Sequence, residues 1–368
     1  MQKIINEIKL DFDDVLIRPK RSKLTSRSEV DISRTFSFLH STRTLKCIPI
    51  VVANMDTTGT FNMAYSLCSQ GSMVALHKHY KPEEYISFYS NPNYNNISHL
   101  AFLSIGTSHS DTEKLNYILS NLSNKGISLP NICIDVANGY SEKFVKTTAN
   151  IRKHYSDIIM MAGNVVTGEM VEELLLHGGV DIIKVGIGPG AVCTTRLKTG
   201  VGYGQISACL ECADAAHGLG GHICADGGCK HAGDVCKAFG CNSDFVMLGS
   251  MFAGTDECEG DWTYDFFESS SESENNTITI KRKSALKFYG MSSKEAMEKH
   301  HNGVAHYRTS EGRCVHVPYK GKAIEVFQDV CGGIRSASTY IGASKIKDFG
   351  KKTTFIMVNN THTKTYEK

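Results

Sequence analysis

The middle of the chain reads Asp181-Ile-Ile-Lys-Val-Gly-Ile-Gly-Pro-Gly-Ala-Val-Cys193, an apolar run that gives way to glycines and a proline. A short apolar run without polar alternation is typical of a strand buried on both faces of a parallel sheet. Helical patterns precede it at 167–177 and follow it at 205–217. The stretch therefore predicts a strand at 181–188 between two helices, with a glycine-rich loop at the strand's carboxyl end.

The same alternation of apolar run and helical pattern recurs along most of the chain. The other predicted strands are residues 48–55, 73–77, 100–106, 132–138, 158–165, 222–228 and 244–250. The other predicted helices are residues 61–70, 82–89, 112–124, 141–153 and 230–239. Eight strands alternating with helices favour an α/β fold, a single (β/α)8 TIM barrel, whose catalytic groups follow the carboxyl ends of the strands. A doubly wound open sheet is the alternative, because a strand count does not establish closure.

The composition is that of a globular and nearly neutral protein. Of 368 residues, 41% are hydrophobic, and 40 Lys and Arg against 38 Asp and Glu leave a net charge of +2. This balance excludes wholesale disorder and gives no electrostatic reason to expect nucleic acid or an anionic membrane as a partner. The N-terminus shows no signal-peptide pattern, and no apolar run approaches the roughly 18 residues of a membrane span. We therefore expect a soluble, cytosolic protein whose 13 cysteines are mostly buried thiols.

The amino-acid composition of the sequence changes after the eighth predicted strand. Residues 256–283 place acidic and aromatic side chains around a Ser/Glu-rich run, which predicts a solvated, mobile insertion. Residues 292–322 are polar and rich in Gly, His and Lys, as expected for a flap over a site. Gly332-Gly333 opens a small-residue segment, and 356–368 has the composition of a polar tail. We expect one catalytic domain, 1–368, that carries this insertion, flap and tail.

The loop after the strand at 181–188 offers two kinds of chemistry. Its glycines and proline give an unusual backbone that can turn several carbonyls inward, which suits an alkali cation better than zinc. Cys193 at its tip is a candidate nucleophile, and Arg196 could supply positive charge. The alternative for Cys193 is a packed structural thiol. Neither this loop nor the Gly200-x-Gly-x-Gly run has the spacing of a Rossmann dinucleotide fingerprint.

Two glycine-containing turns follow the seventh and eighth strands, where a barrel usually binds phosphate. Backbone N–H groups of Asp226-Gly227-Gly228 and Gly249-Ser250 can approach a phosphate, and the Asp226 carboxylate can accept from two ribose hydroxyls. Ordinary turns are the alternative for either pair alone. Farther on, Tyr307-Arg308-Thr309-Ser310-Glu311-Gly312 offers an arginine for phosphate or a purine edge and a carboxylate for proton transfer.

Cysteines and histidines elsewhere suggest a metal site that we do not favour. The cysteine cluster comprises Cys209, Cys212, Cys224, Cys229, Cys236 and Cys241. Its members fall mostly within predicted helices and strands, whereas a structural zinc site uses knuckle-like turns around its cysteine pairs. We expect His77, His79, His300 and His301 to be loop and flap residues rather than ligands.

Several motifs together resemble the inosine monophosphate dehydrogenase/guanosine monophosphate reductase superfamily, and its reductase branch in particular. The motifs are Leu10-Asp-Phe-Asp-Asp-Val-Leu-Ile-Arg-Pro-Lys-Arg-Ser22, Ala53-Asn-Met-Asp56, His77-Lys-His-Tyr80, Asp135-Val-Ala-Asn-Gly-Tyr140, Met161-Ala-Gly-Asn-Val-Val166, the Cys193 loop, Asp226-Gly-Gly228 and Tyr289-Gly-Met-Ser-Ser293. Only residues 78–99 lie between His77 and Leu100, too few for the regulatory modules that the dehydrogenases usually insert there.

The resemblance implies a homotetrameric enzyme that uses NADPH to convert GMP into IMP and ammonia. It implies that Cys193 forms a thioimidate at purine C2 and that Thr195 and Glu311 relay protons. The implied GMP-binding residues are Asp226, Gly227, Gly228, Gly249, Ser250, Gly290, Met291, Ser292, Arg308, Thr309, Ser310, Glu311 and Gly312. The implied NADPH-binding residues are Ser26, Arg27, Lys78, Asp135, Val136, Ala137, Met291, Tyr307, Arg308, Ser336, Ala337, Ser338 and Thr339. The implied potassium site comprises carbonyls of Gly188, Gly190 and Cys193, with Arg196 nearby.

Two other functions stay open at this point. An IMP dehydrogenase would run related chemistry in the oxidative direction with NAD. A catalytically silent nucleotide-binding barrel would need no cysteine, threonine and glutamate together, and the sequence keeps Cys193, Thr195 and Glu311.

Overall fold

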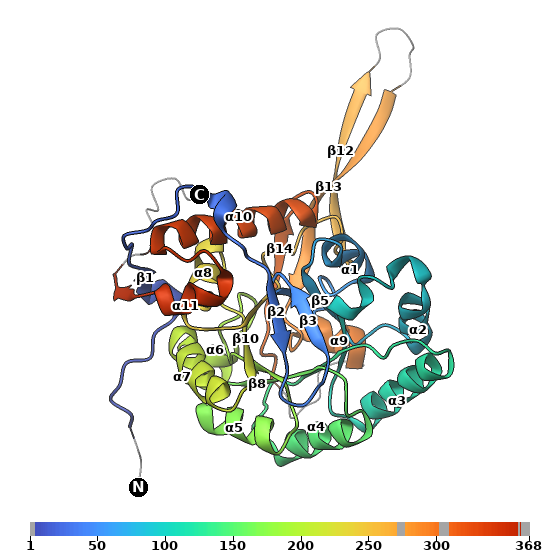
Figure 1. Cartoon of the computed structure of the whole chain (residues 1–368). Coiled ribbons are helices and arrows are strands. Elements are labelled where there is room, and N and C mark those ends of the chain that lie inside the picture. Colours follow the sequence, from blue (N-terminus) through green and yellow to red (C-terminus); the bar gives the residue numbers. More distant parts are fainter. Residues whose placement is uncertain (1–3, 271–276, 302–308, 360, 362–368) are drawn as a thin grey trace.

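Eight parallel strands close into a barrel in the computed structural model, which describes residues 4–270, 277–301, 309–359 and 361 (Figure 1). The barrel strands are β4 (Ile50–Val52), β5 (Met73–Leu76), β6 (Ala101–Ile105), β7 (Ile132–Asp135), β8 (Met160–Val165), β9 (Ile182–Val185), β10 (His222–Asp226) and β11 (Phe245–Leu248). They pair in chain order, and β11 closes the ring on β4. The predicted (β/α)8 barrel is confirmed, and the open doubly wound sheet is excluded.

The barrel strands are buried because their side chains are apolar on both faces. Every residue of β5, β6 and β9 is buried. Lys184 in β9 is the charged member of this set, with 1% exposure. Most of the predicted strands extend past the observed carboxyl ends of the strands. Their last residues, which are polar or glycine, belong to the loops on one face of the barrel.

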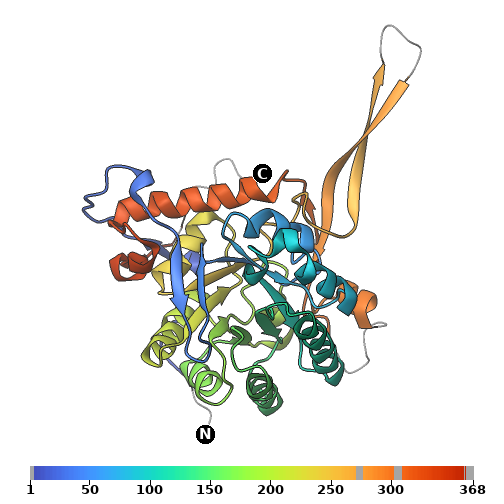
Figure 2. The same cartoon turned by 45° about the vertical axis from the view of Figure 1, so that its right-hand side comes forward.

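Most helices cover the outside of the barrel (Figures 1 and 2). The described helices are α1 (Phe61–Cys68), α2 (Pro82–Ser90), α3 (His109–Asn124), α4 (Glu142–His154), α5 (Gly168–Leu176), α6 (Thr195–Thr199), α7 (Gln205–Gly218), α8 (Ala232–Gly240), α9 (Lys294–His301), α10 (Ala323–Ile341) and α11 (Phe349–Lys352). Of these, α6 and α9 contribute residues to cavities at the carboxyl end of the barrel. Short 3-10 turns occupy Phe12–Asp14, Arg27–Glu29, Pro92–Tyr94, Ser98–Leu100 and Ile346–Asp348. Helix α3 begins before the predicted residue 112, because Ser108 caps it: Asp111 N donates to Ser108 Oγ at 3.1 Å.

The glycine pair at 332–333 lies inside α10 rather than at the start of a new segment. A Cβ at Gly333 would lie 2.6 Å from the Cβ of Ala232, the first residue of α8. The missing side chain therefore lets α10 approach α8 closely. The prediction took the pair as a boundary because glycine weakens an isolated helix, and tertiary packing outweighs that preference here.

The predicted insertion contains a long β-hairpin. Strands β12 (Trp262–Ser270) and β13 (Thr277–Tyr289) pair in antiparallel fashion, and β13 also pairs with β14 (Cys314–Pro318). The distal part projects away from the barrel as an arm (Figures 1 and 2). Lys281 lies over the Tyr264 ring at 3.8 Å, and Asp265 faces Arg282, so cross-strand pairs support the arm. Residues 271–276 of the predicted mobile run lie outside the described residues.

The amino- and carboxyl-terminal segments pair with each other. β1 (Val15–Ile17) and β15 (Phe355–Met357) form a two-stranded sheet, so the predicted polar tail begins within a strand. Residues 360 and 362–368 of that tail lie outside the described residues. In the described ranges, every helix is too short or too polar to cross a membrane. The single domain at 1–368 stays a prediction.

A hairpin covers the amino end of the barrel. β2 (Arg34–Ser37) pairs with β3 (Thr44–Cys47), and Phe36 stacks on Phe245 with ring centroids 4.3 Å apart. Arg34 Nη1 donates to Oδ1 of buried Asp244 at 2.8 Å, and His217 Nε2 lies 2.7 Å from its Oδ2. Asp244 thereby joins β2, α7 and β11 at the end of the barrel opposite the polar loops.

We predict that replacing His217 by Asn destabilises the protein mainly at acidic pH. The hydrogen bond with Asp244 raises the pKa of His217. Its contribution to the free energy of unfolding is therefore complete below the ordinary histidine value of 6.5 and is lost as the pH rises through the higher folded value. The loss should not exceed about 1 kcal/mol, because solvent screens this 41% exposed side chain. Urea unfolding at several pH values measures it.

The matched control is His154→Asn, since the His154 ring lies against the carbonyl of Asn150. A destabilisation by His217→Asn that is equally large at alkaline pH would contradict the assigned linkage.

Candidate active site

Cys193 lies in the loop after β9, at the carboxyl end of the barrel. The loop turns sharply: Gly186 has a φ of 149°, and a Cβ there would overlap the carbonyl oxygen of Asp226. The backbone N of Cys193 donates to the carbonyl of Gly190 at 3.0 Å, which closes the turn. Cys193 is partly exposed and lines a cavity of about 240 Å³. A small molecule in this cavity would therefore lie within reach of the thiol.

A hydrogen-bonded line leads from Cys193 to a carboxylate. The Sγ of Cys193 lies 3.3 Å from the Oγ1 of Thr195, which donates to Oε2 of Glu311 at 2.8 Å. The backbone holds this line together, since Thr194 N donates to the Glu311 carbonyl at 2.7 Å. Glu311 N in turn donates to the Ser292 carbonyl at 3.0 Å. A hydroxyl placed between a thiol and a carboxylate can carry a proton to a group bound at the cysteine.

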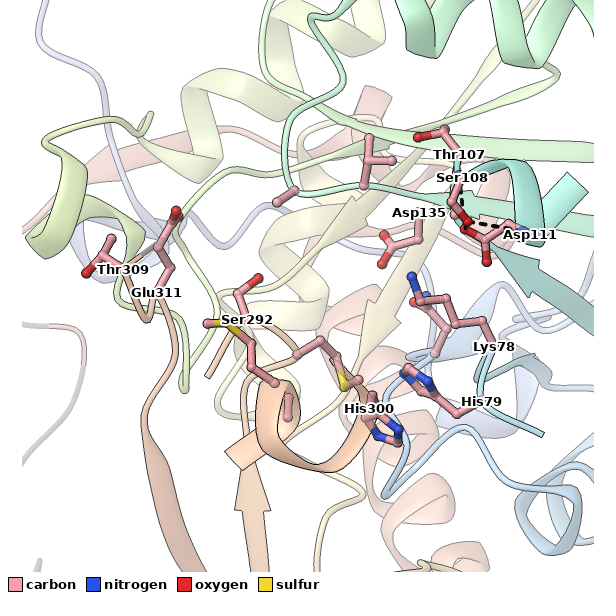
Figure 3. A pocket seen from close by; sticks show the side chains of 17 residues that line it. Lys78, His79, Thr107, Ser108, Asp111, Asp135, Ser292, His300, Thr309 and Glu311 are labelled. Carbon is pink, nitrogen blue, oxygen red and sulfur yellow. Dashed lines mark hydrogen bonds between the residues drawn. The ribbon is translucent and has the colours of Figure 1, made fainter. Parts of the chain in front are cut away.

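A larger cavity of about 600 Å³ adjoins the cysteine cavity (Figure 3). The residues that line both are Asn54, Asp135, Val136, Ala137, Met291, Ser292 and Glu311. Lys78, Ser108 and Asp111 lie at one end, beside the amino-terminus of α3, and Thr309 with Glu311 lies at the other (Figure 3). Two ligands that filled the two cavities would therefore meet near Cys193.

Two histidines form part of the wall of the larger cavity. The rings of His79 and His300 stack with centroids 3.5 Å apart and planes 11° from parallel (Figure 3). Burial, together with the neighbouring His300, lowers the pKa of His79 to about 3. The His79 ring is therefore neutral near pH 7 and offers a flat surface. The sequence predicted loop and flap positions for both, but not their place in a cavity.

A buried lysine links two carboxylates that line the cysteine cavity. Lys184 Nζ contacts Asp135 Oδ1 and lies 3.2 Å from Asp226 Oδ2. Burial alone would lower the pKa of Lys184, but the two carboxylates raise it well above its usual value. Burial likewise opposes ionisation of Asp135, yet Lys184 keeps the pKa of that carboxyl low. Asn164 Nδ2 donates to Asp226 Oδ2 at 2.9 Å and completes the set.

The sequence reasoning missed Lys184 and Asn164. A lysine within the otherwise apolar run 182–185 was a visible signal, because a buried charge requires a partner. Its partners could not be named from the sequence, since β7, β9 and β10 meet only in the closed barrel.

The predicted nucleotide-binding residues are brought together in part. Asp226, Gly290, Met291, Ser292 and Glu311 line the cysteine cavity, and Thr309 lines the larger one. The other described members line neither cavity. Gly227, Gly228, Ser310 and Gly312 lie within two residues of a lining residue in the chain, whereas Gly249 and Ser250 do not. Arg308 lies outside the described residues.

The predicted cofactor residues fall into two groups. Lys78, Asp135, Val136, Ala137 and Met291 line the larger cavity. Among the described residues, the second group lines neither cavity: Ser26, Arg27, Ser336, Ala337, Ser338 and Thr339. These lie on the 3-10 turn η2 (Arg27–Glu29) with its cap and on α10, which pack against each other. The hydroxyl of Ser338 is buried and donates to the Ile334 carbonyl at 2.8 Å. Tyr307 and Arg308 lie outside the described residues.

In the predicted cation loop, the side chain of Arg196 is paired with residues outside the loop. The Arg196 guanidinium pairs with Asp11, at 2.5 Å for Nη1–Oδ2 and 2.9 Å for Nη2–Oδ1, and also donates to the Tyr203 carbonyl. Its charge is therefore neutralised outside the loop and does not oppose a cation there. Gly188 has a φ of 88°, a conformation that turns its peptide in a way other residues rarely adopt.

The six clustered cysteines are buried free thiols. Burial raises the pKa of Cys209 and of Cys236 to about 12, so these sulfurs are protonated near pH 7. In the part of the chain that the structure describes, no group of three or more His, Cys, Asp or Glu side chains is arranged to hold a metal ion.

Nearly the whole chain matches one known family. The model of the IMP dehydrogenase / GMP reductase domain matches residues 9–367. The chain belongs to this family. Its relatives include the GMP reductase of Phytophthora infestans, 53% identical over 359 residues that cover 98% of the chain and 93% of that protein. GMP reductase 2 of Homo sapiens is 53% identical, with 97% of each chain covered. The GMP reductase of Shewanella pealeana is 49% identical, with 100% and 99% covered.

The family membership confirms the resemblance drawn from the sequence motifs. Within the IMP dehydrogenase / GMP reductase family, the relatives at about half identity are GMP reductases, in agreement with the reductase-like segments at 135–140 and 289–293.

We predict that iodoacetamide modifies Cys193 selectively in the folded protein. Cys193 and Cys314 are partly exposed, and the other cysteines are buried. Burial raises the pKa of Cys314, which lowers its thiolate fraction. Peptide mass spectrometry after brief labelling should find Cys193 modified first, with Cys314 slower. Labelling of a barrel cysteine such as Cys224 before Cys193 would contradict the open cysteine cavity.

Proposed function

We propose that the chain is a GMP reductase that converts GMP to IMP and ammonia with NADPH, through a covalent intermediate on Cys193. The observation that carries the proposal is the line Cys193–Thr195–Glu311 at the junction of two adjoining cavities. A protein that only binds a nucleotide does not need a thiol that is linked to a carboxylate through a hydroxyl. A two-step substitution at a purine carbon needs all three groups.

The reaction divides into two additions and eliminations at C2 of the purine. The Cys193 thiolate forms a bond to C2, and the amino group leaves as ammonia after it gains a proton, which leaves a thioimidate. Glu311 provides that proton through the Thr195 hydroxyl, because threonine alone is too weak an acid. NADPH supplies the hydride that reduces C2. The bond between C2 and sulfur then breaks, and the thiolate is regenerated. In total, GMP, NADPH and two protons give IMP, NADP⁺ and ammonium.

GMP fits the cysteine cavity by its chemistry. Asp226 lines this cavity, and its carboxylate can accept from ribose hydroxyls. Lys184 and Asn164 hold that carboxylate in place, with Lys184 Nζ 3.2 Å and Asn164 Nδ2 2.9 Å from its Oδ2. The neighbouring Gly227-Gly228 and Gly249-Ser250 offer backbone N–H groups to the phosphate. Residues 290–292 and 309–312 of the flap cover the base in this assignment, which places Glu311 next to C2.

NADPH fits the larger cavity. Lys78 at its far end carries positive charge for the phosphates, and Asp135 with Val136 and Ala137 lies where the two ligands meet. The predicted cofactor residues on η2 and α10 pack together away from this cavity. This separation supports a homotetramer in which Ser26, Arg27 and Ser336–Thr339 of one copy complete the cofactor site of another.

A monovalent cation, potassium, is proposed in the loop after β9. The carbonyls of Gly188, Gly190 and Cys193, with Arg196 nearby, supply neutral oxygens, which suit a weakly hydrated alkali ion. Asp11 neutralises the Arg196 side chain nearby, so the loop has no excess positive charge to repel the ion.

We propose the cytosol as the location. All thirteen cysteines are free thiols, although several are close in the chain, such as Cys209 and Cys212. Free thiols in this number fit a reducing compartment. The proposed reaction, purine nucleotide interconversion with a reduced cofactor, is also consistent with this compartment.

The direct test supplies each nucleotide with each cofactor. Purified protein with GMP and NADPH should consume NADPH, measured by absorbance, and release IMP and ammonia. Formation of NADH from IMP and NAD⁺ instead would identify an IMP dehydrogenase. The absence of any turnover, with no purine adduct on Cys193 by mass spectrometry, would indicate a silent binding protein.

We predict that Cys193→Ala abolishes turnover while GMP affinity stays within about an order of magnitude, because the thiol reacts rather than binds. Calorimetric titration with GMP measures the affinity. A loss of binding as large as the loss of turnover would overturn the covalent role.

We predict that Glu311→Gln separates the two half-reactions. Deamination should fall by about 10²–10⁴-fold, because the amide cannot donate the proton that ammonia needs. Hydride transfer needs no such proton, so IMP and NADP⁺ should still give a rapid burst of NADPH with adduct on Cys193. Stopped-flow absorbance measures the burst. Equal loss of both half-reactions would contradict the relay.

We predict that replacing K⁺ by Li⁺ at constant ionic strength lowers kcat/KM at least about tenfold, because carbonyl rings favour the larger, more weakly hydrated ion. The same rate in both salts would remove the cation from the proposal.

A further inference from the structure

One buried carboxylate oxygen receives three donors from β13 and the flap. Asp56 lies in the loop after β4 and is 4% exposed. Its Oδ2 accepts from Tyr289 Oη at 2.7 Å, from His300 Nε2 at 2.8 Å and from Lys299 Nζ at 3.0 Å. Tyr289 ends β13, and the other two donors lie near the end of α9. A barrel loop and the flap are thus joined at one atom.

The donors keep this carboxylate ionised. Burial opposes ionisation of Asp56, but hydrogen bonds from His300 and Tyr289 and the charge of Lys299 hold its pKa below the usual value. Removing α9 from its place would withdraw two donors, one of them a cation, from a buried charge. That separation is unfavourable, so the contact favours the docked position of α9.

The stacked imidazoles add a second contact in the same direction. His300 on α9 stacks on His79, which follows β5 (Figure 3). The Asp56 hydrogen bond fixes the His300 ring from its edge, and the stack fixes it from its face. α9 is therefore held against two neighbouring barrel loops.

α9 adjoins the flap segment that lines the cysteine cavity. Gly290, Met291 and Ser292 line this cavity, and only Ser293 separates them from the helix in the chain. Ser293 N donates to the Gly290 carbonyl at 2.9 Å, and Met297 N donates to the Ser293 carbonyl at 3.0 Å. Because the Ser292 carbonyl accepts a hydrogen bond from Glu311 N, the position of α9 also affects the position of Glu311.

We propose that Asp56 is a positioning residue that latches α9 to the barrel and so presets the flap loop 290–292 and Glu311 over the cysteine cavity. It touches neither reacting atom and acts through α9. The inference rests on the proposed function in one respect, since it takes this cavity as the GMP site.

The test is Asp56→Asn, which keeps the shape of the side chain and removes its charge. Backbone hydrogen exchange in 290–301 of the ligand-free protein should become at least about tenfold faster, because the docked state loses its anchor. KM for GMP should rise by at most that factor, since apparent affinity scales with the fraction of docked flap. At saturating GMP, binding restores the docked flap, so kcat should stay within about threefold.

The matched control is Asp244→Asn. Asp244 is also a buried carboxylate that pairs with histidine and a cation, but at the opposite end of the barrel. This variant should lower the melting temperature while leaving exchange in 290–301 and KM for GMP unchanged. The same change in both variants, or a fall in kcat with KM unchanged for Asp56→Asn, would overturn the latch.

A second route weakens the latch from the flap. The double variant Lys299→Met and Tyr289→Phe removes two of the three donors and leaves Asp56 in place. It should speed exchange in 290–301 and raise KM for GMP in the same direction as Asp56→Asn; unchanged exchange would overturn the proposal. If the wild-type protein fails to reduce GMP, the proposed function fails, and the exchange measurement still reports on the latch.

Discussion

The ion cluster around Lys184 is the constraint on which the site depends. A lysine inside a closed barrel is tolerated only when opposite charges surround it, because water cannot reach it. Asp226 supplies one of those charges from the neighbouring strand β10, and Asp135 supplies the other from β7, on the far side of β8. Each carboxylate also lines the cysteine cavity. Neutralising one buried charge therefore fixes the two acidic groups between which the proposed nucleotide and cofactor meet.

The barrel and the flap contribute different residues to the site. The barrel contributes the parts that must be rigid: the turn that carries Cys193, the ion cluster and the glycine turns after β10 and β11. The flap and the loop before it contribute Glu311 and residues 290–292. The flap backbone reaches the cysteine loop through hydrogen bonds, and Val315 and Val317 pack on the small apolar cluster that includes Val192.

The sequence predicts the barrel well because its strands are continuous apolar runs, and it predicts the cysteine loop because three glycines in such a turn are conspicuous. Other features depend on tertiary contacts and leave weaker traces. Asp56 and His300 are far apart in the chain and meet only when the flap docks. The strands of the arm mix aromatic and charged residues, which resemble a solvated loop in composition. The glycine pair in α10 is understood only from the close approach of α8.

The arm is a part of the chain where insertions and deletions are tolerated. From Asp265 outward, the strands of the described hairpin pair with each other, while β14 pairs with β13 only from Ala285 onward. Adding or removing a residue pair in that part of the hairpin does not move the barrel or the flap. The arm is therefore suited to serve as an attachment point, where a reporter peptide or a surface tether can be grafted without disturbing turnover.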